Sequence, residues 1–191
     1  MISLDEDMVG SDASTVIVAG LKVCLGLWVK LGNGTLLGAH FTPATPLNEI
    51  NLMLGHINVA AAGNIVWMGA VAKFSSWAGA TCGITTIAGL LNHFRGQVGY
   101  AGPVTYANLT WGAPSYDIKC WTGITPILEY RPTPNPVAVV GAPNANVFKV
   151  TGAVAKVLSH CGGGGHPGAI HNLPASMAGF ARLSEDLQTH P

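Results

Sequence analysis

Cys24 and His40 are the residues of this chain whose types and spacing best suit covalent chemistry. They lie in two apolar segments on either side of the tripeptide Gly32-Asn33-Gly34. An imidazole beside a thiol lowers the thiol pKa and holds the thiolate as a nucleophile, and it can then protonate a leaving amine. The pair therefore predicts a cysteine nucleophile with a histidine partner.

Residues 14–19, 23–31 and 35–41 are expected to be strands because they are short apolar runs. Asn and Gly accept the positive φ of a tight turn, so the tripeptide predicts a hairpin centred on Asn33. Paired residues then have numbers that sum to about 66, which places Cys24 opposite Phe41 or Thr42. His40 lies within a residue or two of that position, subject to register and facing.

Composition narrows the classes of partner. Only 9% of the 191 residues are charged, and the formal net charge is zero. This balance argues against a nucleic-acid partner. The low charge expected at the surface suggests that a protein partner or a second copy of the chain covers part of it. The longest apolar stretches are too short for a membrane helix, so no membrane partner is expected.

The remaining segments predict an α+β fold. Residues 64–74, 96–106, 111–120 and 124–130 read as strands, and residues 47–56 and 81–94 read as helices. Further helices are expected over residues 145–160 and 175–187. The fold class predicted is a mixed, mainly antiparallel sheet or sandwich with one central helix and C-terminal helices.

Three parts of the chain are expected. Residues 1–13 form a flexible tail, residues 14–130 a catalytic domain, and residues 131–191 a proline-rich connector with a helical extension and a glycine-rich loop. The acidic residues 1–12 lack the basic start of a secretory signal, which favours the cytoplasm or export without a classical signal peptide. Four widely spaced cysteines are expected to be reduced.

The run GLKVCLGLWVKLGNGTLLGAHFTP resembles the CheD-type chemoreceptor glutamine deamidases. In those enzymes a glycine precedes the cysteine at a strand start, and after a turn a second glycine precedes a His-Phe pair followed by proline, which residues 38–43 are similar to. The resemblance covers roughly residues 14–130 and extends to the fold of deamidases similar to cytotoxic necrotizing factor. It implies a chemotaxis or toxin-like effector role.

The resemblance assigns the site residues. Cys24 would attack a glutamine carboxamide of a protein substrate, His40 would serve as its base and acid, and the thioester would be hydrolysed. Leu25 and Thr42 would lie at the oxyanion or positioning site. The family's threonine position is Val18 here, which offers only its carbonyl as the third member, with residues 14 and 15 as alternatives. No cofactor or metal is implied.

A second motif leaves an alternative open. Residues 159–169, SHCGGGGHPGA, resemble the glycine-rich loop of the accessory domain in DHH-type phosphoesterases, where it approaches a nucleotide or RNA phosphate. Gly163, Gly164 and His166 would make that contact, although four glycines favour a flexible linker between two helices, and a metal site is the weakest interpretation. The alternatives to a deamidase are therefore a nucleotide- or RNA-binding module and a non-catalytic structural or assembly domain. Cys82, expected at a helix start, is the rival nucleophile.

Overall fold

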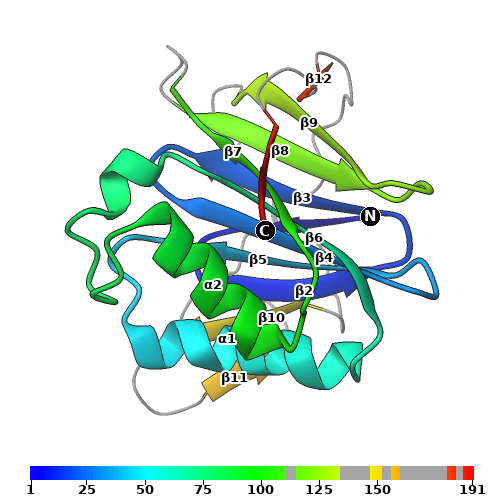
Figure 1. Ribbon diagram of the computed structural model, residues 1–191, viewed down its shortest axis with the longest axis horizontal. Helices are drawn as coiled ribbons and strands as arrows, with labels where there is room; N and C mark the ends of the chain where they lie inside the picture. The colour runs from blue at the N-terminus through cyan, green and yellow to red at the C-terminus, as the bar shows by residue number, and fades with distance from the viewer. Residues whose placement is uncertain (111–114, 134–146, 152–155, 160–179, 184–186) are drawn as a thin grey trace.

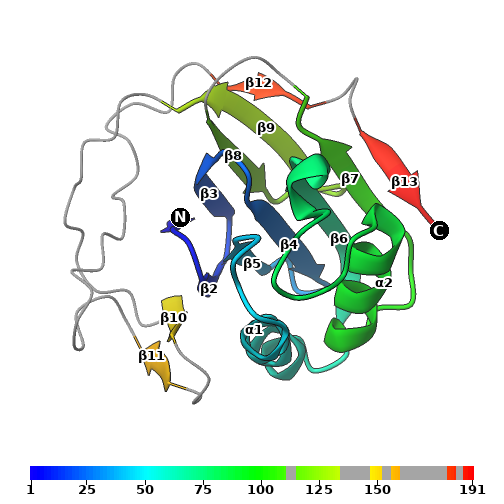
Figure 2. The same cartoon turned by 90° about the vertical axis from the view of Figure 1, so that its left-hand side faces the viewer.

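The computed structural model describes residues 1–110, 115–133, 147–151, 156–159, 180–183 and 187–191, with the backbone alone for 147–151 and 156–159. Within these residues the chain forms three layers, which Figure 1 shows from one side and Figure 2 at a right angle to it. Two helices cover one face of an eight-stranded sheet, and a five-stranded sheet covers the other face. The described part is thus an α+β fold with mixed sheets, as the sequence predicted at that coarse level.

The larger sheet has the strand order β11-β10-β2-β5-β4-β6-β7-β13. Its pairs are antiparallel apart from the parallel β6/β7 pair. Its strands are β2 (Met8–Asp12), β4 (Leu25–Leu31), β5 (Leu36–Phe41), β6 (Ile65–Ala72), β7 (Val104–Asn108), β10 (Val147–Thr151), β11 (Lys156–Ser159) and β13 (Gln188–His190).

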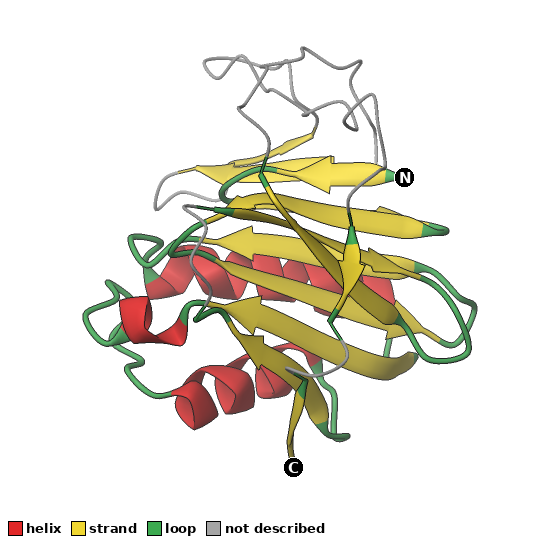
Figure 3. Cartoon of the chain, turned by 90° about the horizontal axis from the view of Figure 1, so that it is seen from above, coloured by secondary structure: helices red, strands yellow, loops and turns green. Residues whose placement is uncertain are grey.

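The smaller sheet has the order β1-β3-β8-β9-β12, with a parallel β1/β3 pair and antiparallel pairs elsewhere. Its strands are β1 (Ile2–Leu4), β3 (Thr15–Leu21), β8 (Tyr116–Trp121), β9 (Ile127–Pro132) and β12 (Ala181–Arg182). Most strands of both sheets, with the two helices beneath them, are seen from above in Figure 3.

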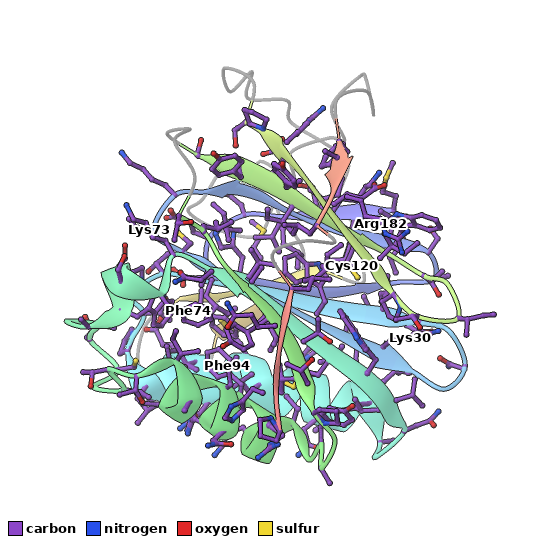
Figure 4. The ribbon with its side chains drawn as sticks, turned by 45° about the horizontal axis from the view of Figure 1, so that its top comes forward. Lys30, Lys73, Phe74, Phe94, Cys120 and Arg182 are labelled. Atoms are coloured by element: carbon purple, nitrogen blue, oxygen red, sulfur yellow. The ribbon has the colours of Figure 1, made fainter. Side chains whose placement is uncertain are left out.

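The two helices are α1 (Leu47–Ala61) and α2 (Ile87–Val98), and a short 3-10 turn, η1, spans Phe74–Trp77. The α2 helix starts where the Thr86 side chain accepts a hydrogen bond from the Gly89 N–H, which caps its first turn. Phe94, labelled in Figure 4, stacks on Phe41 of β5 with ring centroids 5.1 Å apart. This aromatic contact joins α2 to the larger sheet across the core beneath the helices.

Strand β4 is buried on both faces because it lies between the helices and the smaller sheet. Leu25, Leu27, Val29 and Leu31 belong to the core beneath the helices. Cys24, just before the strand, and Trp28 belong to the core between the sheets. This placement explains why the sequence of β4 is apolar apart from Lys30, rather than alternating between apolar and polar residues.

The N-terminal segment differs from the flexible tail that the sequence predicted. β1 and β2 are ordered strands, and Ile2, Leu4, Met8 and Val9 are each at most 2% exposed. The acidic composition was misleading because three of the four acidic residues lie in the turn between the strands and Asp12 lies at the end of β2, while the apolar residues flanking the turn enter the core. β1 pairs with β3 and β2 with β5, so this segment is part of both sheets.

The C-terminal helices are also not found in the described residues. Residues 147–151 and 156–159 form an antiparallel pair of strands, and residues 181–182 pair with β9. The segment VFKVT is rich in β-branched and aromatic residues, which favour strands. Moreover, strands beyond residue 131 pair with β2, β7 and β9, so the expected domain boundary falls inside shared sheets.

The expected helix over 81–94 begins later, at Ile87, because Gly83 has a positive φ of 76° and Thr86 supplies the cap. The expected strand over 96–106 instead contains the end of α2 and a connecting segment, and β7 starts only at Val104. α1 extends beyond the predicted residues 47–56 to Ala61. These shifts leave the order of elements around the Cys24 region unchanged.

Candidate active site

Cys24 and His40 lie on the same face of the β4/β5 hairpin, the face that meets the smaller sheet. Gly26 pairs with His40 and Leu25 with Phe41, so paired numbers sum to 66 as predicted. By that register Cys24 and His40 are diagonal neighbours on this face, since Cys24 lies two residues before the residue directly opposite His40. The Gly32-Asn33-Gly34 turn sets this register, with Gly34 at φ 91° and its N–H bonded to the Leu31 carbonyl.

The loop that carries Cys24 is held at both sides. Gly20 has a positive φ of 69° at an irregularity between β3 and β8, and its N–H donates to Asp117 Oδ1 at 3.1 Å. The Trp77 indole N–H donates to the Val23 carbonyl at 3.1 Å. Cys24 therefore sits at a point where two distant elements fix the main chain before β4.

The Cys24 thiol is buried, with 2% of the residue exposed, and it contacts an acidic side chain. Its Sγ donates to Glu6 Oε1 at 3.7 Å. Burial, and secondly the negative charge of Glu6, raise the Cys24 pKa to about 12, while main-chain hydrogen bonds from Val23 and Lys22 act in the opposite direction. In this conformation the thiol is protonated at neutral pH.

The His40 imidazole is 1% exposed and is oriented by a backbone carbonyl. Its Nδ1 lies 3.3 Å from the Leu4 carbonyl oxygen. If Nδ1 carries the proton, Nε2 is left as the basic nitrogen. The His40 carbonyl in turn accepts the Asp7 N–H at 2.8 Å, which ties the β1/β2 turn to β5.

Val18, whose carbonyl was proposed as the partner of the imidazole, is a core residue between the two sheets. It lies in β3 between Leu4 of β1 and Ile118 of β8, and its side chain is fully buried between the sheets. The carbonyl that contacts the imidazole belongs to Leu4. The type of contact that the sequence suggested is therefore present, but a neighbouring strand supplies it.

The two positions proposed for oxyanion binding or positioning have distinct surroundings. Thr42 N–H donates to the Thr45 hydroxyl at 2.9 Å, so that N–H is already engaged. Leu25 points its side chain into the core beneath the helices. The main-chain groups that reach the sulfur are instead those of Val23 and Lys22.

An apolar floor lies beside the pair. A Cβ on Gly26 would come within 2.5 Å of the Trp28 ring, so the indole covers the glycine opposite His40. The Trp28 N–H donates to the Val16 carbonyl at 3.1 Å, which fixes the ring between the sheets. Trp28 and Cys24 belong to the same core between the sheets, so this side of the pair is apolar.

Sequence reasoning missed Leu4, Glu6 and Asp7, all from the segment expected to be a tail. The detectable signal was the pattern of apolar residues on both sides of an Asp-Glu-Asp turn, which is typical of a hairpin tip. Their nearness to Cys24 depends on pairings between distant strands, which the local sequence does not encode.

The remaining candidates lie elsewhere. Gly163, Gly164 and His166 fall outside the described residues. Cys82 is buried in the core beneath the helices. It precedes the first residue of α2 by several positions, so it does not lie at the start of that helix as the sequence predicted. Cys24, Cys82 and Cys120 are unpaired thiols. No group of three metal-ligating side chains is found among the described residues.

Comparison with known proteins yields no match to a family model, a curated protein or a solved structure. In the part of the chain that the structure covers, no helix has the length and apolar character to cross a membrane.

Proposed function

We propose that this chain is a cysteine-dependent amidohydrolase that deamidates glutamine side chains of a protein substrate. The observation that carries the proposal is the register of β4 and β5, which puts Cys24 and His40 on one face with the imidazole held by the Leu4 carbonyl. The CheD-like run of residues around the hairpin supports the same chemistry.

The chemistry begins when His40 Nε2 takes the thiol proton and Cys24 Sγ attacks the carboxamide carbon. The main-chain groups of Val23 and Lys22 that bond to the sulfur are near enough to favour negative charge there. His40 then gives its proton to the carboxamide nitrogen, the C–N bond breaks and ammonia leaves, which forms a thioester on Cys24. Water adds to the thioester with His40 as base, which releases glutamate and restores the thiol.

For this reaction we interpret the arrangement as a closed form, because burial and, secondly, the Glu6 carboxylate beside the sulfur raise the pKa of the Cys24 thiol. Turnover requires that the Glu6 side chain leave the sulfur and that the imidazole take the proton. Glu6 is an exposed residue although it contacts the buried thiol, so its side chain can leave the sulfur toward solvent.

A non-catalytic structural domain is the second candidate. The specific observation in its favour is the near-complete burial of both Cys24 and His40, since a buried thiol is most often a small apolar core residue. On this view the pair contributes packing alone, and replacing Cys24 by alanine would change only the stability of the fold.

The two candidates are separated with 6-diazo-5-oxo-norleucine, a glutamine analogue that alkylates the nucleophile of glutamine amidohydrolases. The deamidase predicts that mass spectrometry finds the label on Cys24, that His40→Ala abolishes it, and that Cys120 stays unlabelled. Dimethylcasein should release ammonia with the wild type but not with Cys24→Ala, while Cys120→Ala serves as the matched control. Absence of label on Cys24 in both the wild type and a Glu6→Ala variant would overturn the deamidase.

A further inference from the structure

The turn between β1 and β2 presents a single side chain to the candidate nucleophile. The Met8 N–H donates to the Asp5 carbonyl at 3.2 Å, which closes a four-residue turn with Glu6 near its tip. Asp7 has a positive φ of 58°, an uncommon conformation for a residue other than glycine. The result is that the Glu6 carboxylate reaches the Cys24 sulfur while the residue stays at the surface.

Three contacts anchor this turn next to the pair. The Asp7 N–H donates to the His40 carbonyl at 2.8 Å, and Thr45 donates its hydroxyl proton to Asp7 Oδ1 at 2.7 Å. The Thr42 and Thr45 hydroxyls, both in the segment after β5, are 3.0 Å apart, which holds Thr45 in position for its bond to Asp7. The turn is thus seated on the strand that carries the histidine, beside the strand that carries the cysteine.

The group at the sulfur is chemically the product of the proposed reaction. A glutamate carboxylate is what remains after a glutamine carboxamide is deamidated, and the Glu6 Oε1 atom is 3.7 Å from the Cys24 Sγ atom. A side chain that reaches the sulfur from a turn also indicates the approach that a substrate side chain can take. The same carboxylate disfavours the thiolate by its negative charge.

We propose that Glu6 is a built-in product mimic, so that the Asp5–Asp7 turn inhibits the site and the substrate is a glutamine displayed at the tip of a similar tight turn. This inference rests on the proposed function. It adds two points to that function: the shape of the substrate segment, and inhibition by the chain's own turn. A substrate turn reaches Cys24 only after the Asp5–Asp7 turn has moved away.

The decisive test is the variant Glu6→Gln, which puts a substrate carboxamide where the carboxylate lies. Cys24 Sγ would attack the carbonyl carbon of the introduced carboxamide, and the C–N bond would break as ammonia leaves with a proton from His40. Water would then cleave the thioester to a carboxylate and free thiol. Residue 6 should therefore revert to glutamate in the purified full chain, as peptide mass spectrometry would detect.

Controls are available within the same chain. Gln97 is exposed on α2 and should remain glutamine, which sets the rate of spontaneous deamidation. In the double variant Glu6→Gln/Cys24→Ala, residue 6 should also remain glutamine. Reversion at residue 6 that is equally fast without Cys24 would contradict the inference.

A second measurement keeps the inference testable if the turn shifts in the Glu6→Gln variant. Glu6→Ala should speed labelling of Cys24 by 6-diazo-5-oxo-norleucine by roughly tenfold, because the loss of one hydrogen bond to a charged group favours the open form. Labelling at the wild-type rate, together with no reversion at residue 6 in Glu6→Gln, would overturn the product-mimic role while leaving the deamidase standing. No labelling at all would instead overturn the deamidase.

Discussion

The ion pair between Arg131 and Asp117 should be essential to the stability of the smaller sheet and of the loop that carries Cys24. The guanidinium donates to Asp117 Oδ2 from Nε at 3.1 Å and from Nη2 at 3.0 Å. Asp117 Oδ1 accepts the Thr133 hydroxyl and the Gly20 N–H, each at 3.1 Å. Both charged side chains are only 8% exposed.

Replacing Arg131 by methionine would leave the Asp117 carboxylate buried without the guanidinium. Removing one partner of a buried pair typically costs about 3–5 kcal/mol, far more than the pair's net contribution, because the remaining charge is poorly solvated. We expect a loss of that size in the free energy of unfolding. Adding Asp117→Asn should restore roughly 2 kcal/mol, since Asn removes the charge and still accepts from Gly20.

The assay is urea unfolding followed by tryptophan fluorescence and far-UV circular dichroism, with both transitions required to coincide. The matched control is Lys119→Met, which breaks the Lys119–Glu129 pair between the same two strands. This pair is more exposed, with 13% and 19% of the side chains accessible, so its loss should cost about 1 kcal/mol or less.

Two results would refute the reasoning. A loss below about 1 kcal/mol in Arg131→Met would mean that solvent reaches the carboxylate. A further loss on adding Asp117→Asn in that background would mean that the charge itself stabilises the fold without its partner.

Three further predictions follow from particular contacts. Burial raises the pKa values of the Cys24 and Cys120 thiols, to about 12 for Cys24, so the folded state keeps protons that the unfolded state loses above its pKa of 9.0. Stability should therefore fall as the pH rises above 9.0, and urea midpoints should show a weaker fall in Cys120→Ala. Gly38→Ala should lower stability by about 1–3 kcal/mol, because its Cβ would meet a valine Cγ1 of β3 at 2.6 Å, whereas Gly55→Ala, in open space on α1, should be neutral or stabilising in thermal melts. Gly20→Ala should cost about 1 kcal/mol by the same melts, because its φ is 69°, and it should slow labelling of Cys24.

The comparison of sequence with structure shows where local signals suffice. The Gly32-Asn33-Gly34 turn determined the β4/β5 register, because a tight turn leaves one way to pair the strands it joins. The apolar runs likewise located β3, β4, β5 and β6 to within a few residues. The predicted position of Cys24 relative to His40 followed from these local features alone.

Tertiary structure decided what surrounds that pair. The contacts of Leu4 with the imidazole and of Glu6 with the thiol arise because β1 pairs with β3 and β2 with β5, and such pairings depend on the whole core rather than on neighbouring residues. The C-terminal strands are decided in the same way, since a β-branched run becomes a strand when a sheet edge is available to pair with it. The sequence therefore determined that a thiol and an imidazole lie near each other on the two sides of one hairpin, and the packing of the N-terminal strands determined that the thiol contacts a glutamate.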